Sequence, residues 1–255
     1  MGETMEPSDR YLSYMGRGPK RIPHWEHWSN PDAASAITGI DFYEYPRSCM
    51  LRLNEMYPFV PLPVPANDTP LPRIEDQQGQ DRWGHQMRET WQQNHAETRF
   101  SSREEMLRFS PLEQGDFSGW GIVEDGDYSS EEIIYERYRK AFPLEWGDKA
   151  PENSDACVSF YNTMFMWPLL VFGYNNFLAL CLEPEFERIM AEFAEINRRL
   201  FRAFARLPVN FVVCHDDIVL TQGPVCSPQW MQRYVFPYYK EFWGLLKASG
   251  KEVIF

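Results

Sequence analysis

The sequence predicts an α/β fold, and three observations near its C-terminal end support that prediction. The apolar run at 210–214 is short and rich in β-branched and aromatic residues, which is typical of a buried strand. A segment with helical spacing follows from Trp230, and residues 251–255 have strand character again. A strand–helix–strand crossover of this length is most readily parallel and right-handed. We therefore expect this part of the chain to form a β/α unit of a parallel sheet.

The N-terminal half has signals for short elements. Residues 9–15 predict an opening helical turn, and 21–28 a first strand that ends in polar and aromatic groups. A helix is expected over 31–39, ended by a glycine. Six prolines fall within 57–72, too many for a regular element, so this segment is expected to be extended coil or an edge strand. Residues 77–100 are polar and are expected to form a loop or hairpin.

Helical spacing is clearer in the second half of the chain. It appears at 102–109 and at 129–142, where Ser129 is a candidate N-cap. The apolar segment 164–182 is expected to be a buried core strand and turn leading into a helix. The longest helix is expected over 184–205, because its apolar residues define one face and Glu and Arg the other.

The C-terminal unit has the most specific local signals. Ser227 is a candidate N-cap, and Pro228 stands in the first helical position, where its missing N–H has no cost. Pro237 is expected to kink the following helix or divide it into two pieces. Gly250 supplies a helix stop before the last strand.

Composition excludes several classes of protein. The chain has 255 residues, enough for one large domain or two small ones, and a hydrophobic fraction of 44% that is ample for a core. A formal net charge of −12 argues against non-specific nucleic-acid binding, because a phosphate-binding surface needs clustered Lys and Arg. We expect no nucleic-acid partner.

Location is predicted from the cysteines and the apolar segments. The five cysteines are odd in number, widely spaced and form no C-x-x-C pair, which disfavours a secreted disulfide framework. Residues 1–10 are polar and acidic and lack the features of a signal peptide. Pro168 and Gly173 interrupt the one membrane-like segment, 164–182. We expect a soluble, cytoplasmic protein with no membrane contact.

Several short motifs occur in an order and spacing that resemble a known superfamily. They are Asp9-Arg10-Tyr11-Leu12, Arg21-Ile22-Pro23, Thr38-Gly39-Ile40-Asp41, Gly173 leading into Pro184-Glu185-Phe186, and Asp216-Asp217 followed by Gly223-Pro224 and Ser227-Pro228. Together they resemble the uroporphyrinogen decarboxylase superfamily, which includes decarboxylases of haem synthesis and corrinoid-dependent methyltransferases. The resemblance implies a single TIM (β/α)8 barrel domain over 1–255, with its active site where the strands end.

Departures from the family pattern favour one branch of it. The place of an arginine-containing segment that grips substrate carboxylates is held by residues 25–30, which contain no arginine. Leu169 stands where the decarboxylases have a tyrosine, and they have a serine near the position of Asp217. A tetrapyrrole with eight carboxylates needs cationic partners, so porphyrinogen decarboxylation is disfavoured. The methyltransferase branch implies zinc, held by one His and two Cys, and a corrinoid. Those ligands would lie after Phe255, so the resemblance assigns no metal ligand within this chain.

Candidate catalytic residues follow the strand at 210–214. His215, Asp216 and Asp217 combine an imidazole with two carboxylates, which could bind substrate or exchange a proton. The alternative is a hydrogen-bonded turn in which Asp caps loop amides.

Candidate substrate-binding residues come from two other segments. His24, Glu26 and Trp28 end the predicted first strand, although a solvated strand end or buried packing would also explain them. Asn175, on the turn expected after the core strand, could donate hydrogen bonds into the barrel mouth.

The resulting expectation is an enzyme acting on a small molecule, more specifically in methyl transfer that involves a corrinoid, a corrinoid protein or a methylated small molecule. The alternatives are decarboxylation of a porphyrinogen-like substrate and a non-catalytic barrel that acts as a binding subunit. An eight-stranded barrel cannot close without its remaining β/α units, which the resemblance places after Phe255. The chain is therefore expected to be a fragment, incomplete at the C-terminus, with part of its active site absent.

Overall fold

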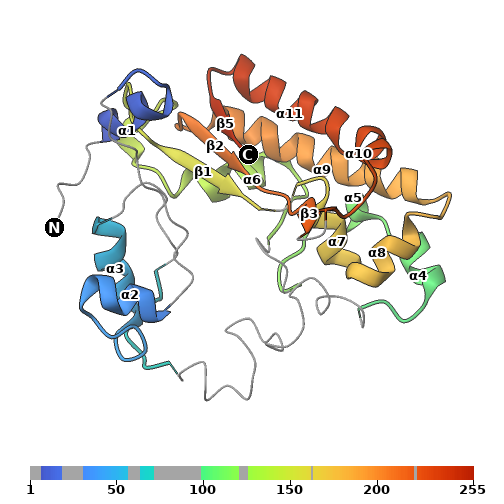
Figure 1. Ribbon diagram of the computed structural model, residues 1–255, viewed down its shortest axis with the longest axis horizontal. Coiled ribbons are helices and arrows are strands. Elements are labelled where there is room, and N and C mark those ends of the chain that lie inside the picture. Colours follow the sequence, from blue (N-terminus) through green and yellow to red (C-terminus); the bar gives the residue numbers. More distant parts are fainter. Residues whose placement is uncertain are drawn as a thin grey trace.

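A computed structural model describes residues 7–18, 31–56, 64–71, 99–120, 126–161, 163–220 and 223–255. Its centre is a three-stranded parallel sheet in the order β1–β2–β5 (Figure 1). The strands are β1 Cys157–Phe160, β2 Phe211–Cys214 and β5 Glu252–Ile254. Within the described ranges, no helix has both the length and the apolar content that crossing a membrane would require.

The sheet register brings the carboxyl ends of the three strands to one edge. Phe160 of β1 is opposite Cys214 of β2, and Val213 of β2 is opposite Ile254 of β5. The predicted strands at 210–214 and 251–255 are therefore confirmed, and they pair in parallel as expected. Residues that directly follow these strands become neighbours at this edge.

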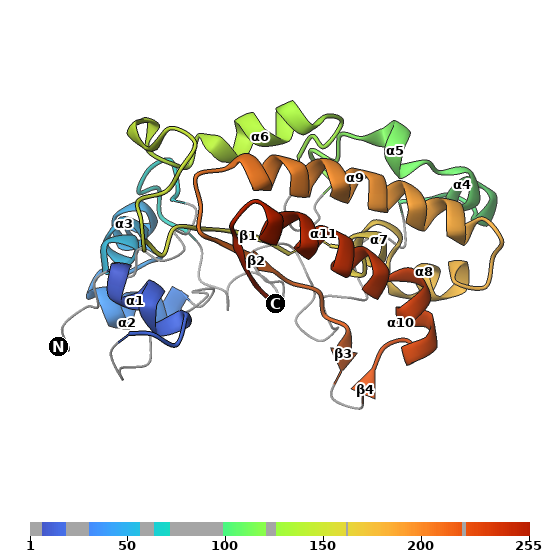
Figure 2. The same ribbon diagram turned by 90° about the horizontal axis from the view of Figure 1, so that it is seen from above.

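Three helices pack together against one face of the sheet. They are α9 Phe186–Arg206, α11 Phe236–Ala248 and α6 Glu131–Arg139, and Figure 2 shows α9 running between the other two. The apolar stripe of α9 lies in a core that also contains Val158, Phe160, Val212 and Cys214 of the sheet. The predicted long helix is confirmed, because an apolar face of this length becomes stable only when it is buried against other elements.

The opposite face of the sheet contacts the first helix, α1 Pro7–Tyr14. Tyr11 and Tyr14 of α1 pack on Phe211, with ring centroids 5.5 and 5.6 Å apart. The sheet thus has packed side chains on both faces at this end, as the apolar run of β2 indicates.

The C-terminal unit follows its local signals closely. The Ser227 hydroxyl accepts a hydrogen bond from the Trp230 N–H at 3.2 Å and caps α10 Pro228–Tyr234. Pro237 lies in the first turn of α11, so the proline divides the helical segment into two helices, as predicted. Gly250 has φ 81°, a left-handed conformation that favours glycine, and the chain then enters β5.

The other predicted helices are present with small shifts. Helix α2 Pro31–Thr38 ends before Gly39, and α4 Arg103–Arg108 is capped by Ser102. Helix α6 is capped by the Ser130 side chain rather than by Ser129, which moves its start by one position. The remaining elements are α3 Pro46–Met56, α5 Pro111–Gln114, the 3-10 helix Leu144–Trp146, β3 Val219–Leu220 and β4 Gly223–Pro224. Helices α2 and α3 share a small core of their own.

The expectation for 164–182 is wrong in its first part. This segment forms two helices, α7 Met166–Phe172 and α8 Tyr174–Leu180, and the strand lies earlier, at β1. Every residue of α7 is buried, so its sequence is apolar on all sides and shows no helical period. A fully buried helix and a fully buried strand look alike in such a run.

Mixed α/β architecture is therefore confirmed, whereas a closed barrel is not shown. Within the described ranges, the strands form the three-stranded sheet and the small antiparallel hairpin of β3 and β4. The strand predicted at 21–28 lies outside the described residues, and so does almost all of the segment 77–100. Residues 64–71, the described part of the proline-rich segment, contain neither helix nor strand, in agreement with the prediction.

Candidate functional site

The carboxyl edge of the sheet brings polar and aromatic groups together. Tyr161 directly follows β1, and His215 directly follows β2. The His215 N–H donates to the Phe160 carbonyl at 3.1 Å, which extends the strand pairing by one step. The rings of Tyr161 and His215 lie with centroids 5.0 Å apart at an interplanar angle of 40°. These contacts fix the imidazole at the edge where parallel sheets usually bind ligands.

His215 is hydrogen-bonded to Asp217. Its Nε2 lies 2.8 Å from Asp217 Oδ1, and the two side chains are 43% and 35% exposed. The hydrogen bond to Asp217 raises the pKa of His215 above its ordinary value of 6.5, although partial burial acts in the opposite direction. The partly exposed imidazole of His215 therefore keeps its proton to a higher pH than an isolated histidine does. Such a group can donate a proton or bind an anion.

Asp216 has a different environment from its two neighbours. Its carboxylate accepts hydrogen bonds from the Thr163 and Tyr239 hydroxyls and from the N–H groups of Phe165, at 3.1 Å, and Met166, at 2.7 Å. The residue is only 9% exposed. Burial is the largest influence and raises the pKa of Asp216, while the four donors oppose it.

These contacts give Asp216 a positioning role. By accepting the N–H groups at the start of α7, it ties this helix to the segment that follows β2, and through Tyr239 it also holds α11. The contacts of Asp216 match the hydrogen-bonded turn that sequence reasoning kept as an alternative, whereas the side chains of His215 and Asp217 are partly exposed. The catalytic role predicted for the three residues stays a prediction. The Ile218 N–H donates to the Asp216 carbonyl at 2.9 Å, so the chain turns tightly at Asp217 directly after the buried Asp216.

Of the remaining predicted site residues, the structure describes Asn175. Asn175 lies exposed in the first turn of α8, a helix rather than the expected turn, and Asn176 donates to the Phe172 carbonyl at 3.0 Å. His24, Glu26 and Trp28 lie outside the described residues, so their predicted role stays a prediction.

Sequence reasoning missed three residues of this region, namely Tyr161, Thr163 and Tyr239. Tyr161 would have been found if β1 had been recognised, because a residue directly after a parallel strand is a site candidate. Thr163 and Tyr239 are 53 and 23 residues from Asp216 in the chain. No local signal in the sequence links them.

The described residues do not fit a zinc site. Within these ranges, no group of three or more His, Cys, Asp or Glu side chains is placed to hold a metal ion. Burial raises the pKa of Cys157 and Cys181 to about 12 and that of Cys226 to about 11. Without a metal, thiols with such raised pKa values stay protonated at neutral pH and are therefore poor nucleophiles.

Comparisons of this chain with protein-family models, with curated proteins and with solved structures found no match. Its function is therefore inferred from its residues and their arrangement.

Proposed function

We propose that this chain is an enzyme of the uroporphyrinogen decarboxylase superfamily, with its substrate site at the edge formed by Tyr161, His215 and Asp217. The pairing of His215 with Asp217 at the carboxyl ends of parallel strands supports this most strongly. Two successive parallel β/α units, β1 to β2 and β2 to β5, are compatible with a segment of a (β/α)8 barrel.

In this proposal His215 transfers a proton to or from a bound small molecule. Asp217 holds the Nε2 side of the ring, which leaves Nδ1 to face a substrate, and its negative charge stabilises the imidazolium. Tyr161 supplies a ring face beside the imidazole, so a substrate with a flat or apolar part would be held next to the proton donor. Asp216 holds the segment 215–217 in place through its hydrogen bonds to Met166 of α7 and Tyr239 of α11.

Within the superfamily we propose methyl transfer, involving a corrinoid or a methylated small molecule, rather than porphyrinogen decarboxylation. Binding eight carboxylates would require several cations at the mouth. The described residues that directly follow the strands offer His215 as a cation, but no arginine. Arginines of the outer helices are held by carboxylates instead, as in the pairs Arg198 with Glu241 and Arg206 with Glu132.

The methyltransferases that the sequence resembles use zinc to hold a thiol as its thiolate, ready to accept a methyl group. Because the described residues do not provide that ligand set, the role that we assign to His215 does not involve zinc.

A pair of assays on the full chain tests this proposal. One follows methyl transfer from methylcobalamin to a small thiol by the change in cobalamin absorbance, and the other follows anaerobic conversion of uroporphyrinogen. We expect activity in the first and none in the second. His215→Asn should lower kcat/KM by about 100-fold or more, the usual contribution of general acid–base catalysis.

Matched variants separate the site from general effects of substitution. Asp217→Asn should reduce the rate and move its pH profile, whereas Asp148→Asn, at an exposed position away from the strand ends, should change neither. Uroporphyrinogen turnover would support the decarboxylase alternative. A chain that is inert in both assays, with or without added zinc, would contradict an enzymatic function and favour a non-catalytic binding subunit.

A further inference from the structure

The contact between β1 and β2 continues beyond the ends of the two strands. The last paired residues of the ladder are followed by Tyr161 and His215, whose ring centroids lie 5.0 Å apart. Further along the same two segments, the Thr163 hydroxyl donates to the Asp216 carboxylate. The ring pair therefore lies between two fixed contacts, the strand pairing on one side and a buried hydrogen bond on the other.

Thr163 differs from the other donors to Asp216 in its place along the chain. It stands two positions after Tyr161, whereas the backbone donors belong to Phe165 and Met166, at the start of α7. Thr163 is 1% exposed, so its hydroxyl is shielded from water and depends on the carboxylate as acceptor. Losing a buried hydrogen bond leaves a polar group unpaired, which strongly favours keeping this contact.

The backbone of His215 is fixed on both sides. Before the imidazole, the His215 N–H donates to the Phe160 carbonyl at 3.1 Å. After it, Asp216 is held by its carboxylate, and its carbonyl accepts the Ile218 N–H at 2.9 Å. The imidazole itself is hydrogen-bonded to Asp217, with Nε2 and Oδ1 2.8 Å apart. Movement of Asp216 would therefore be passed directly to the ring of His215.

Tyr161 is restrained by a short length of chain. It directly follows β1, and the anchor at Thr163 is two residues away, a distance that the chain can span by at most about 7 Å. The donors at Phe165 and Met166 leave more chain between Tyr161 and their contacts. The Thr163 hydroxyl is therefore the donor to Asp216 that restrains the ring of Tyr161 most closely.

We propose that Thr163 is a positioning residue, which fixes the separation and tilt of the Tyr161 and His215 rings through its hydrogen bond to Asp216. Thr163 is buried and does not itself meet a ligand. Its effect on catalysis rests on the proposed function, in which a flat substrate lies on Tyr161 beside the proton donor His215. A shift of about 1 Å in a catalytic group can cost about 100-fold in rate, so a hydroxyl below the site can control the reaction.

An NMR measurement on the full chain tests the position of the rings without any substrate. The ring of Tyr161 shifts the signals of the His215 ring protons, and the difference between the wild-type chain and Tyr161→Leu gives the size of this shift. Thr163→Val keeps the shape of the side chain and removes the hydroxyl, so it should lose most of the shift. Thr163→Ser keeps the hydroxyl and should retain it.

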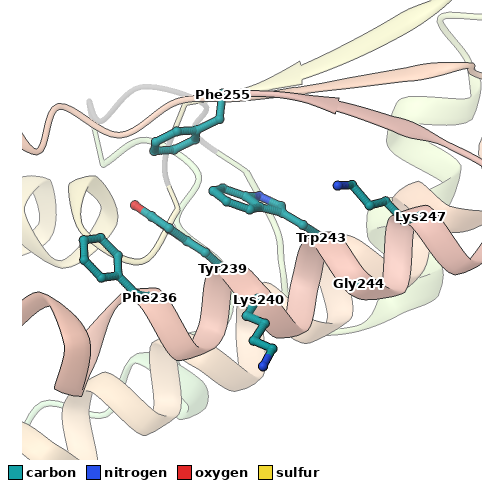
Figure 3. A pocket seen from close by; sticks show the side chains of 7 residues that line it. All are labelled: Phe236, Tyr239, Lys240, Trp243, Gly244, Lys247 and Phe255. Atoms are coloured by element: carbon teal, nitrogen blue, oxygen red, sulfur yellow. The ribbon is translucent and has the colours of Figure 1, made fainter.

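Two matched variants separate this role from a general loss of a hydroxyl. Tyr239→Phe removes another donor to the same carboxylate, but Tyr239 comes from α11, and Figure 3 shows its hydroxyl directed away from that helix. It should leave the ring shift in place. Thr38→Val removes a hydroxyl that donates to the Ala34 carbonyl at 2.8 Å in α2 and should also leave it unchanged. If Thr163→Val does not fold, Thr163→Cys, with its weaker donor, replaces it.

Three outcomes would overturn the proposal: an unchanged ring shift in Thr163→Val, an equal loss in Tyr239→Phe, and an equal loss in Thr163→Ser. In the methyl-transfer assay, Thr163→Val should lower kcat by about tenfold or more with a smaller change in KM, because it displaces catalytic groups. A lower rate with an unchanged ring shift would also contradict the proposal. If the wild-type chain is inert, the proposed function fails, and the NMR comparison alone decides whether Thr163 positions the rings.

Discussion

Replacing Tyr239 by Phe tests the role that the structure gives to Asp216. The substitution keeps the ring, with its stacking on Trp243 and its contact with Phe255, and removes only the hydroxyl that donates to the buried carboxylate. Three donors to that carboxylate remain, from Thr163 and from two backbone N–H groups. The change therefore isolates a single hydrogen bond inside the core.

The expected loss is about 1.5 kcal/mol, the lower end of the range for a hydrogen bond to a charged group, because the acceptor stays partly satisfied. For a chain of this size, this lowers Tm by about 3 to 6 °C. The effect should depend on pH. The Tyr239 hydroxyl favours the ionised carboxylate, so its removal raises the pKa of Asp216 further above the ordinary 3.8.

The sign of this pH dependence follows from linkage. A carboxyl group whose pKa is raised by folding contributes stability below its unfolded pKa and loses that contribution as pH rises through the folded pKa. Tyr239→Phe enlarges the shift, so its cost should be greater near neutral pH than in acid. Urea unfolding at several pH values measures this cost as a change in midpoint with unchanged slope.

Two controls accompany the measurement. Tyr45→Phe removes a hydroxyl from a side chain that is 55% exposed and should change stability by less than about 0.5 kcal/mol. Combining Tyr239→Phe with Thr163→Val should give a non-additive loss, because the two hydroxyls share one carboxylate. If Tyr239→Phe were no more costly than Tyr45→Phe at any pH, the positioning role of Asp216 would be refuted.

Three further predictions concern other parts of the molecule. Asp217→Asn should lower the pKa of His215 toward 6.5, which an NMR titration measures; an unchanged pKa would contradict the pairing. Ser227→Ala should cost about 1 kcal/mol in urea unfolding through loss of the N-cap of α10, and an equal stability would show that this cap contributes nothing. Cys157, which is 6% exposed and has a pKa raised to about 12, should react with a disulfide reagent only as fast as the protein opens; rapid modification of this thiol in the native state would argue against its burial.

Sequence reasoning succeeded where the signals are local. The unit from β2 to β5 has its cap at Ser227, its break at Pro237 and its stop at Gly250, and each of these residues acts within a few positions of itself. The position of His215 and Asp217 at the end of a strand was predictable for the same reason. Both residues could be selected as site candidates once β2 was recognised, because they directly follow that strand.

The rest could not be predicted because it depends on tertiary packing. Helix α7 is buried on all sides, so its sequence has no polar face from which a helical period could be recognised. Because a strand was expected in that segment, the four-residue strand β1 just before it was not predicted. The different environments of Asp216 and Asp217 follow from Thr163 and Tyr239, which meet Asp216 only in the folded chain. Sequence reasoning could therefore nominate both carboxylates, but it could not decide which one is buried.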